Sequence, residues 1–159
     1  MKFTTNEIKL LLEASYDKEM YNVLQFYIDE SVSNERVKCY TMDDTNDVVV
    51  THRGSADLQD WMDNSDWFRI NTLKKSKTFK MHQRQHKIIV SKYGAGNIIV
   101  MGHSRGGLYA TQLYKQHLAN QLITYNKPIN LFDIVKDRFK KNKQDENSTA
   151  VRTSNDLVS

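Results

Sequence analysis

A serine flanked by glycines lies at the centre of the stretch NIIVMGHSRGGLYATQL, which runs from Asn97 to Leu113. Its core, Gly102-His103-Ser104-Arg105-Gly106, satisfies the pattern G-x-S-x-G. This pattern places a nucleophilic serine on a sharp turn from a strand into a helix. The free N–H groups and positive potential of the helix N-terminus would then favour an oxyanion beside the serine. The residue types therefore predict acyl transfer with Ser104 as the nucleophile.

A serine in an ordinary tight turn is the alternative interpretation, because a bare G-x-S-x-G occurs by chance. The context favours the nucleophile. The β-branched run Ile98–Met101 predicts a buried strand before the motif, and the apolar spacing that follows predicts a helix. A further glycine, Gly107, allows a close approach of neighbouring backbone after the serine.

A second stretch, DVVVTHRGSADLQDWMDN from Asp47 to Asn64, is an apolar strand that ends in Arg-Gly-Ser and enters an amphipathic segment. Together with the G-x-S-x-G motif, it resembles the class 3 lipases, the α/β-hydrolase family of fungal triacylglycerol lipases. The resemblance implies that Ser55 is an oxyanion-hole residue and that its partner is the backbone N–H of Arg105. It also implies that the Trp61 segment is a lid over an acyl pocket. A core-facing Trp61 segment is the alternative.

The end of the chain carries a third match. The stretch VRTSNDLVS, Val151 to Ser159, is similar to the family's strand that leads to the acidic member of the triad, which here falls on Asp156. Leu122–Pro128 resembles the strand between. The likeness covers about residue 45 to the C-terminus. It implies an α/β-hydrolase-like fold, reduced or truncated, that hydrolyses carboxylic lipid esters through an acyl-serine. We expect no cofactor and no metal.

The general base of the triad is missing from the family's pattern in this sequence. An α/β-hydrolase triad runs Ser, Asp, His along the chain. No histidine follows Asp156. We expect His103 and His52 to be packing residues and His117 to lie at the far end of the helix after Ser104. The i, i+4 spacing of His82 and His86 suits a metal, but a third ligand is not evident and a solvated basic face is the favoured interpretation. The five histidines are His52, His82, His86, His103 and His117.

Three explanations stay open: a piece of a longer lipase, a short protein that keeps the scaffold for binding or structural work, or a histidine from another chain. Under the first and third explanations, the protein is a lipase or esterase whose triad is incomplete in this chain. The second makes the chain an inactive component of a larger assembly, such as a virion. Candidate partners are a lipid or small ester, a lipid surface and a protein that covers the C-terminal end. The Arg105 side chain either binds an anionic head group or, as favoured, faces solvent.

Composition is that of one ordinary globular domain, with 159 residues, 39% hydrophobic and 26% charged. No apolar run is long enough for a membrane span, no signal peptide is evident, and the single cysteine Cys39 fits a reducing compartment. We expect an intracellular or virion-associated location. Net charge is +4, but the basic clusters at 74–80 and 136–143 are expected to be solvated faces, without specific nucleic-acid binding.

The elements expected to position these residues alternate between helix and strand, which predicts a mainly parallel sheet with helices on both faces. Residues 1–159 are expected to form a single domain, with N-terminal helices over 1–35 and the core over 36–159. Tyr16 and Tyr40 carry no distinguishing signal. The predicted helices are Thr4–Ala14, with Thr4 and Glu7 as a capping box, Lys18–Glu30, a short one within Arg53–Trp67, Phe79–Tyr93, one from the serine toward Asn120, and Ile129–Lys143; the other predicted strands are Val37–Met42, Val48–His52, Leu122–Tyr125 and Ala150–Thr153.

Overall fold

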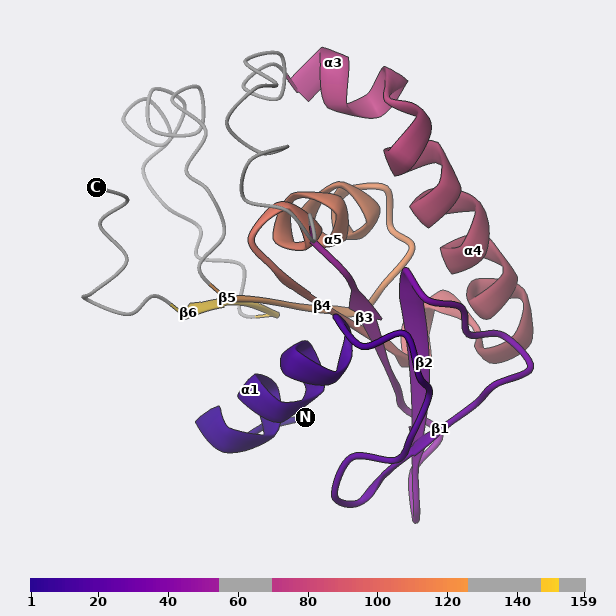
Figure 1. The fold of residues 1–159 in the computed structure, drawn as a ribbon, viewed down its shortest axis with the longest axis vertical. Helices are drawn as coiled ribbons and strands as arrows, with labels where there is room; N and C mark the ends of the chain where they lie inside the picture. The colour runs from indigo at the N-terminus through magenta and orange to yellow at the C-terminus, as the bar shows by residue number, and fades with distance from the viewer. Residues whose placement is uncertain (55–69, 126–146, 152–159) are drawn as a thin grey trace.

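The computed structural model describes residues 1–54, 70–125 and 147–151, and these residues form an α/β fold around one six-stranded sheet (Figure 1). The strands follow one another in sequence order from β1 to β6. β1, β2 and β3 pair antiparallel, whereas β3, β4, β5 and β6 pair parallel. The strands are β1 (Phe26–Ile28), β2 (Val37–Met42), β3 (Val48–His52), β4 (Ile98–His103), β5 (Gln121–Tyr125) and β6 (Ser148–Val151).

Helices cover both faces of this sheet, as the sequence predicts. Helix α1 (Thr5–Ala14) lies on one face, and α4 (Lys77–Tyr93) and α5 (Arg105–Lys115) lie on the other (Figure 1). Strand alternation divides the core between the two faces. In β4, Ile99 and Met101 pack in the cluster that contains α1, while Ile98 and Val100 pack with α4 and α5. The short helix α3 (Ile70–Lys75) and the 3-10 turn η2 (Ala95–Asn97) complete the described elements.

The predicted start of α1 is confirmed. The Glu7 amide donates to the Thr4 hydroxyl at 3.2 Å, and the Thr4 amide donates to the Glu7 carboxylate at 2.7 Å. This reciprocal capping box satisfies backbone donors that the first turn leaves unpaired. Ile8, Leu11 and Leu12 are buried on the face toward the sheet.

The helix predicted from Lys18 to Glu30 is wrong. The stretch contains strand β1, whose Phe26 pairs with Met42 and whose Ile28 pairs with Tyr40. Leu24 has a φ of 52°, which no right-handed helix accommodates. Apolar residues at helical spacing were misleading here, because backbone pairing with the edge of β2 outweighs a weak local helix preference.

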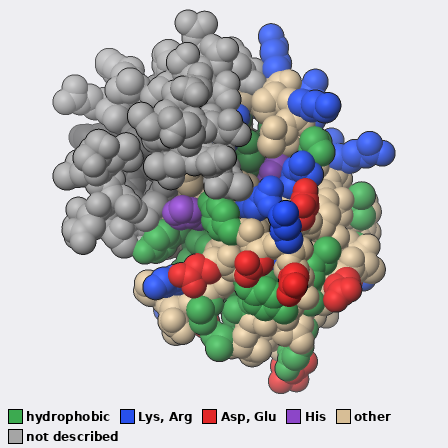
Figure 2. Space-filling view, in the orientation of Figure 1, with side chains coloured by type: hydrophobic (Ala, Val, Ile, Leu, Met, Phe, Trp, Pro, Cys, Tyr) green, Lys and Arg blue, Asp and Glu red, His purple; other side chains and the backbone are tan. Residues whose placement is uncertain are grey.

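Helix α4 begins two residues before the predicted start and ends, as predicted, at Gly94, which has a φ of 81°. The Ser76 hydroxyl caps it by accepting the Phe79 amide at 3.1 Å. The basic cluster at its start is exposed, as expected: Lys and Arg side chains gather over α3 and α4 in Figure 2. The prediction that His82 and His86 belong to a solvated face is wrong, since both are buried.

The other strands agree closely with the sequence. β2 and β3 have the predicted bounds, and β5 begins one residue earlier. β6 begins at Ser148, two residues before the predicted start. The helices predicted within Arg53–Trp67 and over Ile129–Lys143 lie almost wholly outside the described residues. None of the helices described is both long and apolar enough to cross a membrane.

Candidate active site

Ser104 occupies the turn between β4 and α5 in a backbone conformation that side chains rarely adopt. Its φ is 52° and its ψ is −127°. The Ser104 amide donates to the carbonyl of Tyr125 at 3.3 Å, and its own carbonyl accepts the Gly107 amide at 2.9 Å. A non-glycine residue in this region costs on the order of 1–3 kcal/mol and persists only where surrounding structure enforces it. The predicted strand, turn and helix are therefore present, and the serine lies at the strained position.

Two glycines make this turn sterically feasible. A β-carbon on Gly102 would overlap the backbone of Gly106 and Gly107, because the first turn of α5 folds back over the end of β4. A β-carbon on Gly106 would overlap the carbonyl oxygen of His52 at the end of β3. The glycines two before and two after the serine thus serve two different contacts. One packs helix on strand, and the other packs helix on the neighbouring loop.

The Arg53-Gly54 segment lies directly against the start of α5. Strand β3 is the parallel neighbour of β4, and His52 pairs with Gly102. A β-carbon on Gly106 would come within 3.0 Å of the Gly54 nitrogen, and one on Gly54 within 2.9 Å of the His103 carbonyl. The two segments that the sequence singled out for oxyanion binding therefore meet at the carboxyl edge of the sheet.

Tyr16, from the loop after α1, reaches between these two segments. Its hydroxyl lies 2.8 Å from Nδ1 of His103, the residue before Ser104. A β-carbon on Gly54 would lie 2.5 Å from the same oxygen. Burial raises the pKa of Tyr16, and a hydrogen bond from the Gly54 backbone partly opposes that rise. Nothing in the sequence pattern identified Tyr16, because it lies outside the stretch that carries the resemblance.

Three histidines form a buried chain behind β3. His52 Nδ1 lies 3.0 Å from His82 Nδ1, and His52 Nε2 lies 3.0 Å from His86 Nδ1. His86 Nε2 lies 2.8 Å from the carbonyl oxygen of Leu118. A carbonyl only accepts, so His86 Nε2 carries a proton. In neutral rings, His52 Nε2 then donates to His86, and His82 Nδ1 donates to His52.

The surroundings keep all three rings neutral. Burial, followed by the neighbouring histidines, lowers the pKa of His52 well below its usual value. Burial also lowers the pKa of His82 to about 3, and Arg36, Arg53 and Arg105 add to the effect. Burial lowers the pKa of His86 to about 4, against the hydrogen bond to Leu118.

The three histidines do not form a metal centre. His52 uses its two ring nitrogens for different partners, so the nitrogens of the three rings do not converge on one point. In the described ranges, no group of three or more histidine, cysteine or acidic side chains is arranged to hold a metal ion. A sequence signal for burial was present: Phe79, His82, His86 and Ile89 repeat at helical spacing and form the buried stripe of α4.

The structure places only part of the predicted site. Ser104 and Arg105 lie together at the start of α5, with the Arg105 guanidinium 6.0 Å from the Tyr109 ring centre. The Arg105 side chain does not simply face solvent: it is half-buried, and its Nε has no hydrogen-bond partner in the described part of the chain. Exposed His117 lies beyond the opposite end of α5. Ser55, Trp61 and Asp156 lie outside the described residues.

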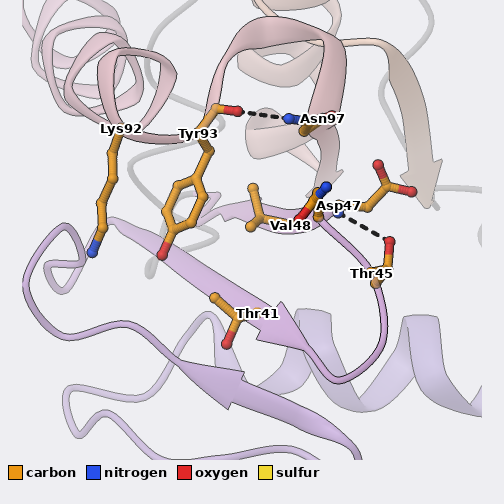
Figure 3. Close-up of a pocket in the computed structure, with 8 residues that line it drawn as sticks. Thr41, Thr45, Asp47, Val48, Lys92, Tyr93 and Asn97 are labelled. Carbon is orange, nitrogen blue, oxygen red and sulfur yellow. Dashed lines mark hydrogen bonds between the residues drawn. The ribbon is translucent and has the colours of Figure 1, made fainter.

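A pocket of about 290 Å³ lies at the other edge of the sheet (Figure 3). Asp47 and Asn97 in its lining precede β3 and β4, at the amino ends of these parallel strands. Ligands of open α/β sheets bind beyond the carboxyl ends of the strands. The pocket is therefore separate from the candidate site. Its lining is Thr41, Thr45, Asn46, Asp47, Val48, Lys92, Tyr93 and Asn97.

No protein-family model matches this chain, and no curated protein matches it in sequence. Any functional conclusion therefore rests on the geometry around Ser104.

Proposed function

We propose that this chain is a serine carboxylic ester hydrolase of α/β-hydrolase type, related to the class 3 lipases. The observation that carries the proposal is the backbone of Ser104, with φ 52° and ψ −127°, at the junction of a parallel strand and a helix. Strain of this size is retained where it serves a function, and a nucleophile raised above the sheet edge is such a function.

The neighbouring backbone supports the same chemistry. Ser104 Oγ would attack the ester carbonyl carbon, lose its proton to a base and form an acyl-serine as the alcohol departs. The negative charge on the carbonyl oxygen needs N–H donors fixed before the reaction. The Arg105 amide at the start of α5 and the amide of Ser55, which follows Gly54, are the proposed donors. Close packing of Gly54 against Gly106 favours this pairing.

The strand order also supports the proposal. β6 is parallel to β5, and Val151 pairs with Tyr125, so β6 ends at the edge of the sheet that holds Ser104. Asp156, the proposed acid of the triad, follows β6 by five residues in the sequence. Lipid esters are the proposed substrate class, because the sequence around Trp61 resembles the lid of the lipases.

Labelling of the serine tests the proposal. A fluorophosphonate probe phosphonylates an activated serine with release of fluoride, and mass spectrometry of the peptide locates the adduct. We expect one adduct on Ser104 in the wild-type chain and none in Ser104→Ala. Absence of labelling in the folded wild-type chain would overturn the proposal.

A second candidate, an inactive lipase-like scaffold within a larger assembly, is favoured by the histidines. His52 and His86 use both ring nitrogens, and His82 uses Nδ1, on one another and on Leu118. Tyr16 contacts Nδ1 of His103. A serine without a base is a weak nucleophile at neutral pH.

Turnover tests whether these residues supply their own general base. Losing one triad member costs on the order of 10⁴-fold or more in kcat, so we expect these 159 residues to hydrolyse p-nitrophenyl butyrate at least about a thousandfold more slowly than an ordinary esterase. Esterase-level turnover that disappears in Ser104→Ala would mean that one of the five histidines acts as the base.

A further inference from the structure

We propose that Tyr16 is a positioning residue that joins the Arg53-Gly54 loop to the serine turn through its hydroxyl, which lies 2.8 Å from His103 Nδ1 and against Gly54. This inference rests on the proposed function of Ser104. It assigns a role in the site to the N-terminal segment, which lies outside the part of the sequence that resembles a lipase.

The directions of the hydrogen bonds follow from the groups involved. The Gly54 amide can only donate, so the phenolic oxygen of Tyr16 accepts from it. In the proposed arrangement the phenolic O–H donates to His103 Nδ1, which accepts in the tautomer that carries its proton on Nε2. One hydroxyl thus holds the residue before Ser55 and the residue before Ser104 at a fixed separation.

Gly54 is suited to this arrangement. A β-carbon there would lie 2.5 Å from the Tyr16 oxygen and 2.9 Å from the His103 carbonyl, so any side chain would force the loop away from the turn. The spacing matters because an oxyanion hole loses its effect when a donor moves by about 1 Å.

The backbone around Tyr16 is itself held in place. Lys38, a buried residue of β2, donates from its ammonium group to the carbonyls of Ala14, Asp17 and Glu19 at 2.6, 2.9 and 2.7 Å. These carbonyls lie on both sides of Tyr16 in the sequence. The tyrosine ring also meets the His103 ring edge-on, with centroids 5.8 Å apart. Tyr16 is therefore a fixed support for the loop.

Tyr16→Phe is the informative variant, because it removes the hydroxyl and keeps the ring. The matched control is Tyr21→Phe, which removes a hydroxyl bonded to Asp17 in the same segment and leaves His103 and Gly54 untouched. Nitrogen NMR of the His103 imidazole provides a readout that does not depend on catalysis. We expect the Nε2-protonated form in the wild type and Tyr21→Phe, and a mixture of tautomers in Tyr16→Phe.

The rate constant for fluorophosphonate labelling of Ser104 provides the functional readout. We expect a decrease of about tenfold in Tyr16→Phe, as for the loss of one to two hydrogen bonds, and no change in Tyr21→Phe. Urea unfolding identifies any loss caused by global destabilisation. An unchanged tautomer, or an unchanged labelling rate in a folded Tyr16→Phe, overturns the role of Tyr16 alone. Failure of the wild type to label overturns the proposed function instead.

Discussion

The backbone strain at Ser104 lowers the stability of the fold, while its hydroxyl is the proposed nucleophile. At φ 52° and ψ −127°, the β-carbon of Ser104 lies too close to its own backbone, and only glycine relieves that contact. Alanine keeps the β-carbon, so it removes the hydroxyl without relieving the strain. Substitution of Ser104 by glycine and by alanine therefore separates the free-energy cost of the conformation from the chemical role of the hydroxyl.

We therefore expect Ser104→Gly to raise the free energy of unfolding by about 1 kcal/mol and Ser104→Ala to leave it within about 0.5 kcal/mol of the wild type. Urea unfolding of the three chains measures both values. Equal stability of the glycine and alanine variants would mean that the turn is not strained. Both variants should lose labelling by the fluorophosphonate.

Gly106 is required for a different reason, namely the space beside the end of β3. A β-carbon there overlaps the His52 carbonyl, and that backbone atom cannot move away as a flexible side chain would. We expect Gly106→Ala to lower the free energy of unfolding by about 3 kcal/mol. Gly96→Ala is the matched control: nothing lies within 4 Å of its added β-carbon, so stability should stay within about 0.5 kcal/mol. Thermal unfolding compares them, and similar costs at both sites would contradict the packing argument.

At the scale of elements, the histidine chain links β3, α4 and the loop after α5. Each ring presents one donor and one acceptor only while it is neutral. Protonation would set two donors against each other and place a charge in a buried site near Arg36, Arg53 and Arg105. The hydrogen bonds of the histidine chain therefore form at neutral pH and are lost in acid.

The pH dependence follows from the direction of the shifts. Folding lowers the pKa of each histidine from about 6.5, so the unfolded chain binds more protons in acid. The contribution of the three neutral histidines to the free energy of unfolding is fully present above about pH 6.5. It is lost as the pH falls toward the folded pKa of about 4 for His86 and about 3 for His82. We expect the free energy of unfolding to fall by about 4 kcal/mol per pH unit near pH 5 from these three groups together.

Urea unfolding between pH 7.5 and pH 5 tests this slope. His82→Gln removes one of the three titrating groups, so we expect its slope to be about a third shallower. The control, His117→Gln, changes an exposed histidine that does not belong to the buried histidine chain, and it should keep the wild-type slope. A slope that is the same in all three proteins would show that the buried histidines do not determine the acid sensitivity.

At the scale of the whole molecule, Lys38 connects the sheet to the N-terminal segment. The alternation of β2 turns Lys38 toward α1, where its ammonium group meets carbonyls at and after the end of that helix. Burial lowers the pKa of Lys38, and Asp17 partly opposes this. A basic group among carbonyls at a helix C-terminus is favourable, because those carbonyls have no partner within the helix.

We expect Lys38→Met to lower the free energy of unfolding by about 3 kcal/mol, since one buried and two partly buried carbonyl acceptors lose their donor. Lys9→Met, which removes an exposed lysine paired with Glu13, should change it by less than about 0.5 kcal/mol. Chemical unfolding of both variants gives the comparison. Because Lys38 holds the backbone around Tyr16, the first variant should also perturb the His103 imidazole in nitrogen NMR. Stability equal to that of Lys9→Met would contradict this role.

The elements that the sequence predicts correctly are those that one local rule decides. The capping box at Thr4 and Glu7 and the strands Val37–Met42 and Val48–His52 follow from side-chain chemistry and two-residue alternation, and the structure has them as predicted. Prediction from the sequence failed over Lys18–Glu30, where pairing with β2 outweighs the local pattern. It also failed at His82 and His86, because a polar residue type concealed a buried helical stripe.

The sequence by itself determined the serine turn, because a glycine two residues before and two after a serine, between a β-branched run and an amphipathic helix, restricts the backbone locally. Tertiary structure alone decided which groups surround that turn. Tyr16, the Arg53-Gly54 loop and the histidine chain come from segments far apart in the sequence. β3 and β4 pair in parallel although α3 and α4 lie between them in the sequence. Local spacing encodes a conformation, whereas contacts between distant segments depend on how the whole core packs.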